Sequence, residues 1–263
     1  MVKKKYQGYC RICGEFGDLS FEHVPPRSAF NNRPVRYINF GSELVLGPEE
    51  QVKGPIQRKG MGGYTLCVRC NNITGHWYGS QFVDWCYQAM NILIRAEGKP
   101  SLIYLTRLYP LPVIKQIVAM FFSINSLDFR KANPDLVDFV LNKDKLYLSP
   151  KYRIFVYYNI EGNFRTTGVT AAMNIVKGKK ISLLTELSYP PFGYIMTFDS
   201  EPSDNRVFEI THFARYSYGT WTPMELKLPI LPTYLGIPGD YRTKEEIVEE
   251  TKRNIENADK RKN

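Results

Sequence analysis

Long apolar runs are missing from this 263-residue sequence. No stretch of about 18 consecutive apolar residues occurs, so no membrane-spanning helix is predicted. No apolar segment follows the basic residues near the start, so a secretory signal is not expected either. With 43% hydrophobic and 23% charged residues, the composition is typical of a folded globular chain rather than a disordered one. We expect a cytoplasmic protein without a membrane partner.

Histidine and cysteine are scarce, with three and five residues respectively, yet four of the cysteines form two close pairs. Cys10-Arg-Ile-Cys13 and Cys67-Val-Arg-Cys70 are separated by 53 residues. In a reducing compartment such pairs indicate metal binding rather than disulfides. Each two-residue knuckle can place two sulfurs on one tetrahedral ion, so we expect a structural Zn²⁺ held by all four cysteines. Cys86 lies on an apolar helix face and is expected to be a buried, inert thiol.

Acidic residues are outnumbered, 26 against 35 lysines and arginines, which leaves a formal charge of +9. No basic tail carries this excess: residues 1–98 hold 12 basic and 8 acidic side chains, and residues 99–263 hold 23 and 18. A positive balance favours polyanionic partners, and nucleic acid is the polymer we expect.

The sequence changes in character near residue 98. Residues 1–98 contain all the cysteines and two of the three histidines, with a turn-rich segment from Ala29 to Gly63. Residues 99–263 alternate helix and strand patterns, so the fold class expected is α+β with a mainly antiparallel sheet in the second part. Helices are predicted at Phe82–Ile94, Val113–Ile124, Asp135–Leu141 and after the capping box Thr243–Glu246. Strands are predicted at Arg153–Ile160, Phe164–Asn174, Ile181–Leu187, Tyr194–Phe198 and Val207–Phe213, followed by proline-rich turns from Pro223 to Pro238.

A polar cluster lies between and just after the cysteine pairs. Glu22 and His23 precede Val24-Pro25-Pro26, and Asn71 and Asn72 directly follow Cys70. One carboxylate and one neutral side chain can hold a hard divalent ion that keeps several waters. The adjacent imidazole can accept the proton of an attacking water, and the ion can stabilise a phosphate under attack. The pattern therefore predicts a one-metal phosphodiesterase, although Asn71 could instead cap the helix expected there.

These motifs, in this order, resemble the HNH endonuclease family. The resemblance covers residues 10 to about 85 and is closest to the variant with Cys-Asn-Asn. It implies an N-terminal ββα-metal module with a zinc ribbon, in which His23 is the general base and Glu22 and Asn71 bind catalytic Mg²⁺ or Mn²⁺. Asn72 or His76, which share a helix face, are substitutes for Asn71. Many members carry an asparagine that steadies the base at the place of Gly62. Either Asn39 replaces it here, or this variant does without it.

The function expected is metal-dependent hydrolysis of DNA phosphodiester bonds, with Arg27 and Arg69 as the best candidates for phosphate contacts. A nuclease-inactive zinc module that binds nucleic acid or a protein partner is the alternative. Residues 99–263 carry no motif that identifies their role. They are candidates for DNA selection, homodimer formation or binding of a protein partner, and their aromatic residues are expected mainly in the core.

Overall fold

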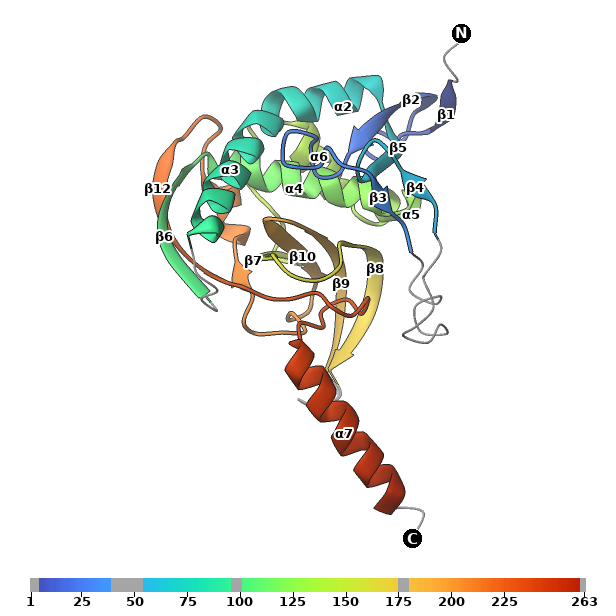
Figure 1. Cartoon of the computed structure of the whole chain (residues 1–263). Helices are drawn as coiled ribbons and strands as arrows, with labels where there is room; N and C mark the ends of the chain where they lie inside the picture. Colours follow the sequence, from blue (N-terminus) through green and yellow to red (C-terminus); the bar gives the residue numbers. More distant parts are fainter. Residues whose placement is uncertain (1–4, 39–53, 96–100, 175–179, 261–263) are drawn as a thin grey trace.

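The computed structural model describes residues 5–38, 54–95, 101–174 and 180–260 (Figure 1). Helices and antiparallel strands are mixed along the chain, which confirms the α+β class. The boundary predicted between residues 98 and 99 lies outside the described residues, as does Asn39. None of the helices in these four segments is long and apolar enough to cross a membrane.

The N-terminal part is a small antiparallel sheet followed by a continuous helical segment. Strands β1 (Tyr6–Tyr9), β2 (Phe16–His23) and β5 (Gly62–Cys67) pair in the order β1-β2-β5. A second, two-residue pairing joins β3 (Val35–Arg36) to β4 (Ile56–Gln57). The chain then continues without a break through α2 (Val68–Thr74), the π-helical turn η1 (Gly75–Gly79) and α3 (Ser80–Ile94). The helix predicted at Phe82–Ile94 is thus confirmed as the second half of a longer helical segment.

The second part is built on a five-stranded antiparallel sheet of order β11-β7-β10-β9-β8. Its strands are β7 (Tyr152–Tyr158), β8 (Arg165–Asn174), β9 (Lys180–Tyr189), β10 (Phe192–Phe198) and β11 (Phe208–Glu209). Four of the five predicted strands are therefore confirmed. The fifth, Val207–Phe213, is wrong beyond Glu209, because Thr211–Arg215 form the 3₁₀ helix η2. The Thr211 hydroxyl accepts the hydrogen bond of the Ile154 amide (2.9 Å), and so takes the place of a backbone partner where the chain turns.

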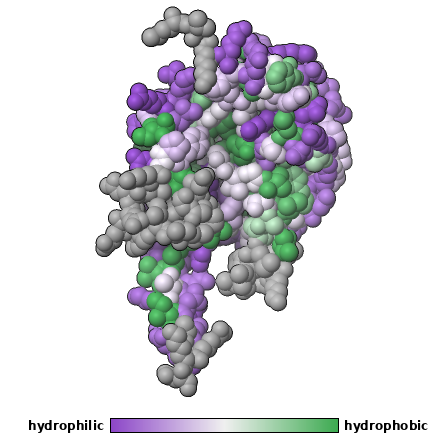
Figure 2. Space-filling view, turned by 90° about the vertical axis from the view of Figure 1, so that its right-hand side faces the viewer, coloured by the Kyte–Doolittle hydropathy of each residue, from purple (hydrophilic) through white to green (hydrophobic). Residues whose placement is uncertain are grey.

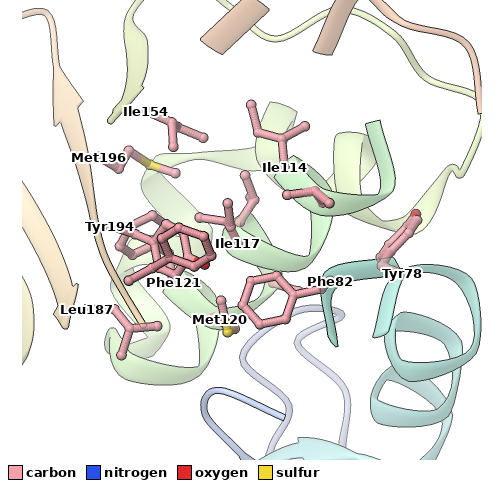
Figure 3. Close-up of a cluster of buried hydrophobic side chains, with 14 of the residues drawn as sticks. Tyr78, Phe82, Ile114, Ile117, Met120, Phe121, Ile154, Leu187, Tyr194 and Met196 are labelled. Atoms are coloured by element: carbon pink, nitrogen blue, oxygen red, sulfur yellow. The ribbon is translucent and has the colours of Figure 1, made fainter. Parts of the chain in front are cut away.

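Helix α4 (Pro110–Ile124) is the centre of the core, between this sheet and the helical segment α2–α3 (Figure 1). It is buried on every side except at Ile124, and its polar residues Lys115 and Gln116 are buried with the apolar majority. Figure 3 shows Ile117 and Phe121 of α4 beside Tyr194 of the sheet, and Met120 beside Phe82 of α3. One cluster of buried side chains includes all of these together with Ile12 and Leu66 of the N-terminal part. Two short helices, α5 (Leu127–Ala132) and α6 (Pro134–Leu141), follow α4.

A long strand pairing was not expected. Strand β6 (Ser101–Leu108) pairs antiparallel with β12 (Thr222–Pro229), so the prediction of turns from Pro223 is wrong as far as Pro229. Leu226 and Leu228 are buried, while Glu225 and Lys227 are exposed. Among the described strands this sheet has two members, so each has one side without a ladder partner, where proline is tolerated.

The chain ends in helix α7 (Lys244–Lys260), which projects away from the body (Figures 1 and 2). Its capping box is confirmed: the Thr243 amide donates to Glu246 (2.7 Å) and the Glu246 amide donates to the Thr243 hydroxyl (3.2 Å). Two apolar side chains of α7 are exposed, Val248 with an exposed fraction of 51% and Ile255 with 57%.

Candidate metal centre and adjoining polar site

The four paired cysteines meet at one point. Cys10 and Cys13 lie in the turn after β1, Cys67 ends β5, and Cys70 lies in the first turn of α2. Their sulfurs all lie within 4.8 Å of one another, and the Cys13 and Cys67 sulfurs are 3.9 Å apart. Sulfurs bound tetrahedrally at about 2.3 Å from one ion are about 3.8 Å apart. The four cysteines are thus positioned to hold a metal ion.

Local hydrogen bonds shape the turn of each cysteine pair. Gly14 adopts a positive φ of 81°, and its amide donates to the Cys10 carbonyl (2.8 Å), which closes the first turn. In the second knuckle the Cys70 amide donates to the Cys67 sulfur (3.4 Å). A hydrogen bond with Cys70 lowers the pKa of the Cys10 thiol to about 4, so a thiolate is favoured in the cluster. Cys86 lies outside the cluster, and burial raises the pKa of its thiol.

Glu22 and His23 are the last two residues of β2 and differ in their surroundings. Glu22 is 4% exposed, and its Oε2 atom has no hydrogen-bond partner. Burial, together with the nearby Cys10 sulfur, raises the pKa of Glu22 to about 8. His23 is partly exposed, and its Nε2 atom lies 2.9 Å from the Lys59 carbonyl oxygen. Desolvation, with smaller contributions from Arg27 and Lys59, lowers the pKa of His23.

Asn71 reaches β2 from α2. Its Nδ2 atom donates to the Ser20 hydroxyl (2.9 Å) and to the Phe21 carbonyl (3.4 Å). The helix begins at Val68 with Cys67 as its N-cap, so Asn71 does not cap the start of the helix. Asn72 and His76 are exposed. The structure thus brings Asn71, of the three candidates, beside the strand that carries Glu22.

Position 62 has no room for a side chain larger than that of glycine. Gly62 pairs with His23 across β2 and β5 at a φ of 153°, and an added Cβ would collide with the Glu22 carbonyl. Its amide donates to the Tyr37 hydroxyl (3.0 Å). A larger side chain would therefore have to displace the backbone of the strand that ends in His23.

A buried side-chain amide from another loop, which no sequence pattern indicated, stabilises this region. Asn31 is fully buried, and its Nδ2 atom donates to the carbonyls of Pro25 and Met61, both at 2.7 Å. The Met61 amide donates back to Asn31 Oδ1 (2.7 Å). Met61 is two residues from Lys59, so Asn31 fixes the segment whose carbonyl orients His23. A turn-rich stretch of sequence contains no signal that distinguishes such an asparagine from one in an exposed turn.

Basic side chains near the site divide into exposed and structural ones. Arg27 and Arg69 are both exposed, as a phosphate contact requires. Arg11 instead donates to the Ser123 carbonyl (2.6 Å), and Arg130 donates to the Ile12 carbonyl (2.8 Å). These two arginines tie the first cysteine knuckle to α4 and α5.

Comparison with known proteins finds no match to this chain among protein-family models, curated proteins or solved structures. Its function must therefore be inferred from the geometry of the site itself.

Proposed function

We propose that this protein is a metal-dependent endonuclease of the HNH type that hydrolyses DNA phosphodiester bonds. The observation that carries the proposal is the buried, unpartnered carboxylate oxygen of Glu22, which neighbours the oriented His23 in a strand that Asn71 contacts. The charge of a buried carboxylate without a hydrogen-bond donor is costly unless a proton neutralises it or a cation compensates it. The raised pKa of Glu22 corresponds to the first state, and a divalent ion bound to Glu22 would produce the second. Among the residues that the structure describes, no arginine or lysine forms an ion pair with Glu22 that could compensate its charge.

The four-cysteine cluster is proposed to hold Zn²⁺ with a structural role. Four soft sulfur donors select Zn²⁺ over Mg²⁺ and leave no open coordination position for a substrate. The cluster joins β1, β5 and α2, so the ion would hold the sheet against the helix that carries Asn71.

Glu22 and Asn71 are proposed to hold a catalytic Mg²⁺ or Mn²⁺. Carboxylate and amide oxygens are the donors that these hard cations prefer. Both hydrogen bonds of the Asn71 side chain use Nδ2, which leaves its amide oxygen for a cation. Such an ion would stabilise the charge that develops on the phosphate and on the departing 3′ oxygen.

His23 is proposed as the general base. The Lys59 carbonyl can only accept a hydrogen bond, so Nε2 of His23 carries the hydrogen. In the neutral imidazole Nδ1 is then the basic nitrogen. This atom would take the proton of the attacking water, while the bond to Lys59 keeps the ring oriented.

Nicking of supercoiled plasmid with added Mg²⁺ or Mn²⁺ tests the proposal. His23→Ala should lower the rate by about 10²–10⁴, the usual contribution of a positioned proton acceptor. His212→Ala is the matched control, because His212 lies in η2, outside the site, and should nick like wild type. Equal rates for wild type and His23→Ala, in preparations free of contaminating nuclease, would refute the role of His23.

A zinc module that binds nucleic acid without cutting it is the competing function. The 4% exposure of Glu22 favours it, because a hydrated divalent ion needs an opening to solvent. DNA binding without any nicking in Mg²⁺ and in Mn²⁺ would select this function.

A further inference from the structure

Four aromatic rings form a continuous row across the N-terminal sheet, here called the aromatic row: Tyr6, Tyr64, Phe21 and His23. The rings of Tyr6 and Tyr64 are stacked, with centroids 3.7 Å apart and planes at 16°. Tyr64 meets Phe21 edge to face at 5.4 Å, and Phe21 meets His23 in the same way at 4.9 Å. The row therefore leads from the edge strand β1 to the proposed general base.

The aromatic row lies on the face of the sheet opposite α2. Phe21 and His23 are two residues apart on β2 and so share a face. Ser20, which has the opposite orientation, bonds to Asn71 of α2. None of the four rings is fully buried, and Tyr6 is 38% exposed. Figure 1 shows β1, β2 and β5 at the periphery of the molecule, at the end opposite to α7.

A lysine ammonium accompanies the rings. Lys59 Nζ lies 5.1 Å from the centre of the Phe21 ring, 5.9 Å from that of Tyr64, and 3.5 Å from the Tyr64 hydroxyl. The carbonyl of the same residue orients His23. Exposed Arg27 adds a second cation near the His23 end of the row.

Cross-strand packing explains part of this arrangement, because Phe21 and Tyr64 are direct partners in the β2–β5 ladder. It does not explain why the row extends to a partly exposed tyrosine on the edge strand and includes a lysine. Aromatic rings interleaved with cations are the chemistry that binds single-stranded nucleic acid, since every base has a face that can stack. The base faces of an intact duplex are stacked inside it and cannot be reached.

We propose that the aromatic row is a stacking platform for unpaired bases, which presents the adjoining phosphate to His23. The substrate class is then single-stranded or locally unpaired DNA rather than intact duplex. The cutting of that strand rests on the proposed nuclease function, whereas its binding does not.

Tyr6→Leu is the informative variant, and Tyr9→Leu is its matched control. Tyr9 lies on the same strand, is 56% exposed, and belongs to the opposite face because it is three residues from Tyr6. Fluorescence anisotropy with a labelled single strand of thymidines and a duplex of equal length, without added divalent metal, measures binding without cutting. Tyr6→Leu should weaken single-strand binding about 5- to 20-fold, the lower part of the range for loss of one stacking ring. Tyr9→Leu should bind like wild type, and Tyr6→Trp should retain the affinity.

Equal effects of Tyr6→Leu and Tyr9→Leu would overturn the proposal, as would duplex bound as tightly as single strand by wild type. The metal content of each variant, unchanged from wild type, shows that the knuckle near β1 is intact. Tyr6-dependent binding without nicking would uphold the platform and refute the nuclease. Plasmid nicking that depends on His23 but not on Tyr6 would support the nuclease and refute the platform.

Discussion

Replacing Asn31 tests how the loop that orients His23 is held in place. The side chain is fully buried and makes three hydrogen bonds of 2.7 Å, two to carbonyls and one from a backbone amide. A hydrogen bond of this kind contributes about 1 kcal/mol net, so Asn31→Ala should lower the free energy of unfolding by about 3 kcal/mol. That is a large part of the roughly 5–15 kcal/mol by which a domain is stable.

The same substitution should also slow cutting in protein that is still folded. Asn31 bonds to Met61, two residues from the Lys59 carbonyl that accepts from His23. A small displacement of a reacting group can cost up to about 10²-fold in rate, and we expect a loss of about tenfold. This loss should be smaller than that of His23→Ala, because the proposed base itself remains.

Urea unfolding of the metal-loaded protein measures the stability change. Asn254→Ala is the control, since Asn254 is exposed on α7 and should change the free energy of unfolding by less than about 0.5 kcal/mol. Asn31→Asp adds a pH test, because it keeps the acceptor and places an oxygen against two carbonyls. Only the protonated carboxyl can donate there, so its pKa should be raised by folding and stability should fall as pH rises. Asn31→Ala with a wild-type unfolding midpoint would refute the structural role of the amide.

Three further predictions concern the metals and the core. Elemental analysis should find about one zinc per chain. Cys67→Ser should lose this zinc and become insoluble or protease-sensitive, whereas Cys86→Ser should keep it. Well-folded wild type without metal would contradict the prediction. Glu22→Gln should retain the zinc but need more Mg²⁺ for half-maximal nicking, and a metal titration identical to wild type would exclude Glu22 as a ligand. Lys115 donates from the core to two backbone carbonyls at the end of α6, and burial lowers its pKa to about 7. The Lys115 ammonium keeps its proton up to a higher pH in the unfolded chain than in the folded one, so the free energy of unfolding of wild type should rise between about pH 7 and 10. Urea unfolding at about pH 7 and at about pH 10 should show no such rise for Lys115→Met.

The elements predicted correctly are those with strong local patterns. The apolar run of Val113–Ile124 lies in α4, and Thr243–Glu246 forms the capping box of α7. Both signals depend on residues close in sequence. The β6–β12 pairing joins segments more than 100 residues apart, and no local pattern identifies such partners. The 3₁₀ helix at Thr211–Arg215 was missed for a related reason, since the Thr211 hydroxyl bonds to a distant strand.

The two cysteine pairs determine by themselves that a four-sulfur metal site can form, because thiol chemistry and knuckle spacing are local properties. Adjacency in sequence likewise places Glu22 and His23 on one strand. Only the tertiary structure decides that one carboxylate oxygen of Glu22 is buried without a hydrogen-bond partner, that Asn31 supports the segment beside His23, and that Tyr6 and Tyr64 stack. These relations join side chains from different strands and loops, and their energies depend on burial and distance, which exist only once the chain has folded.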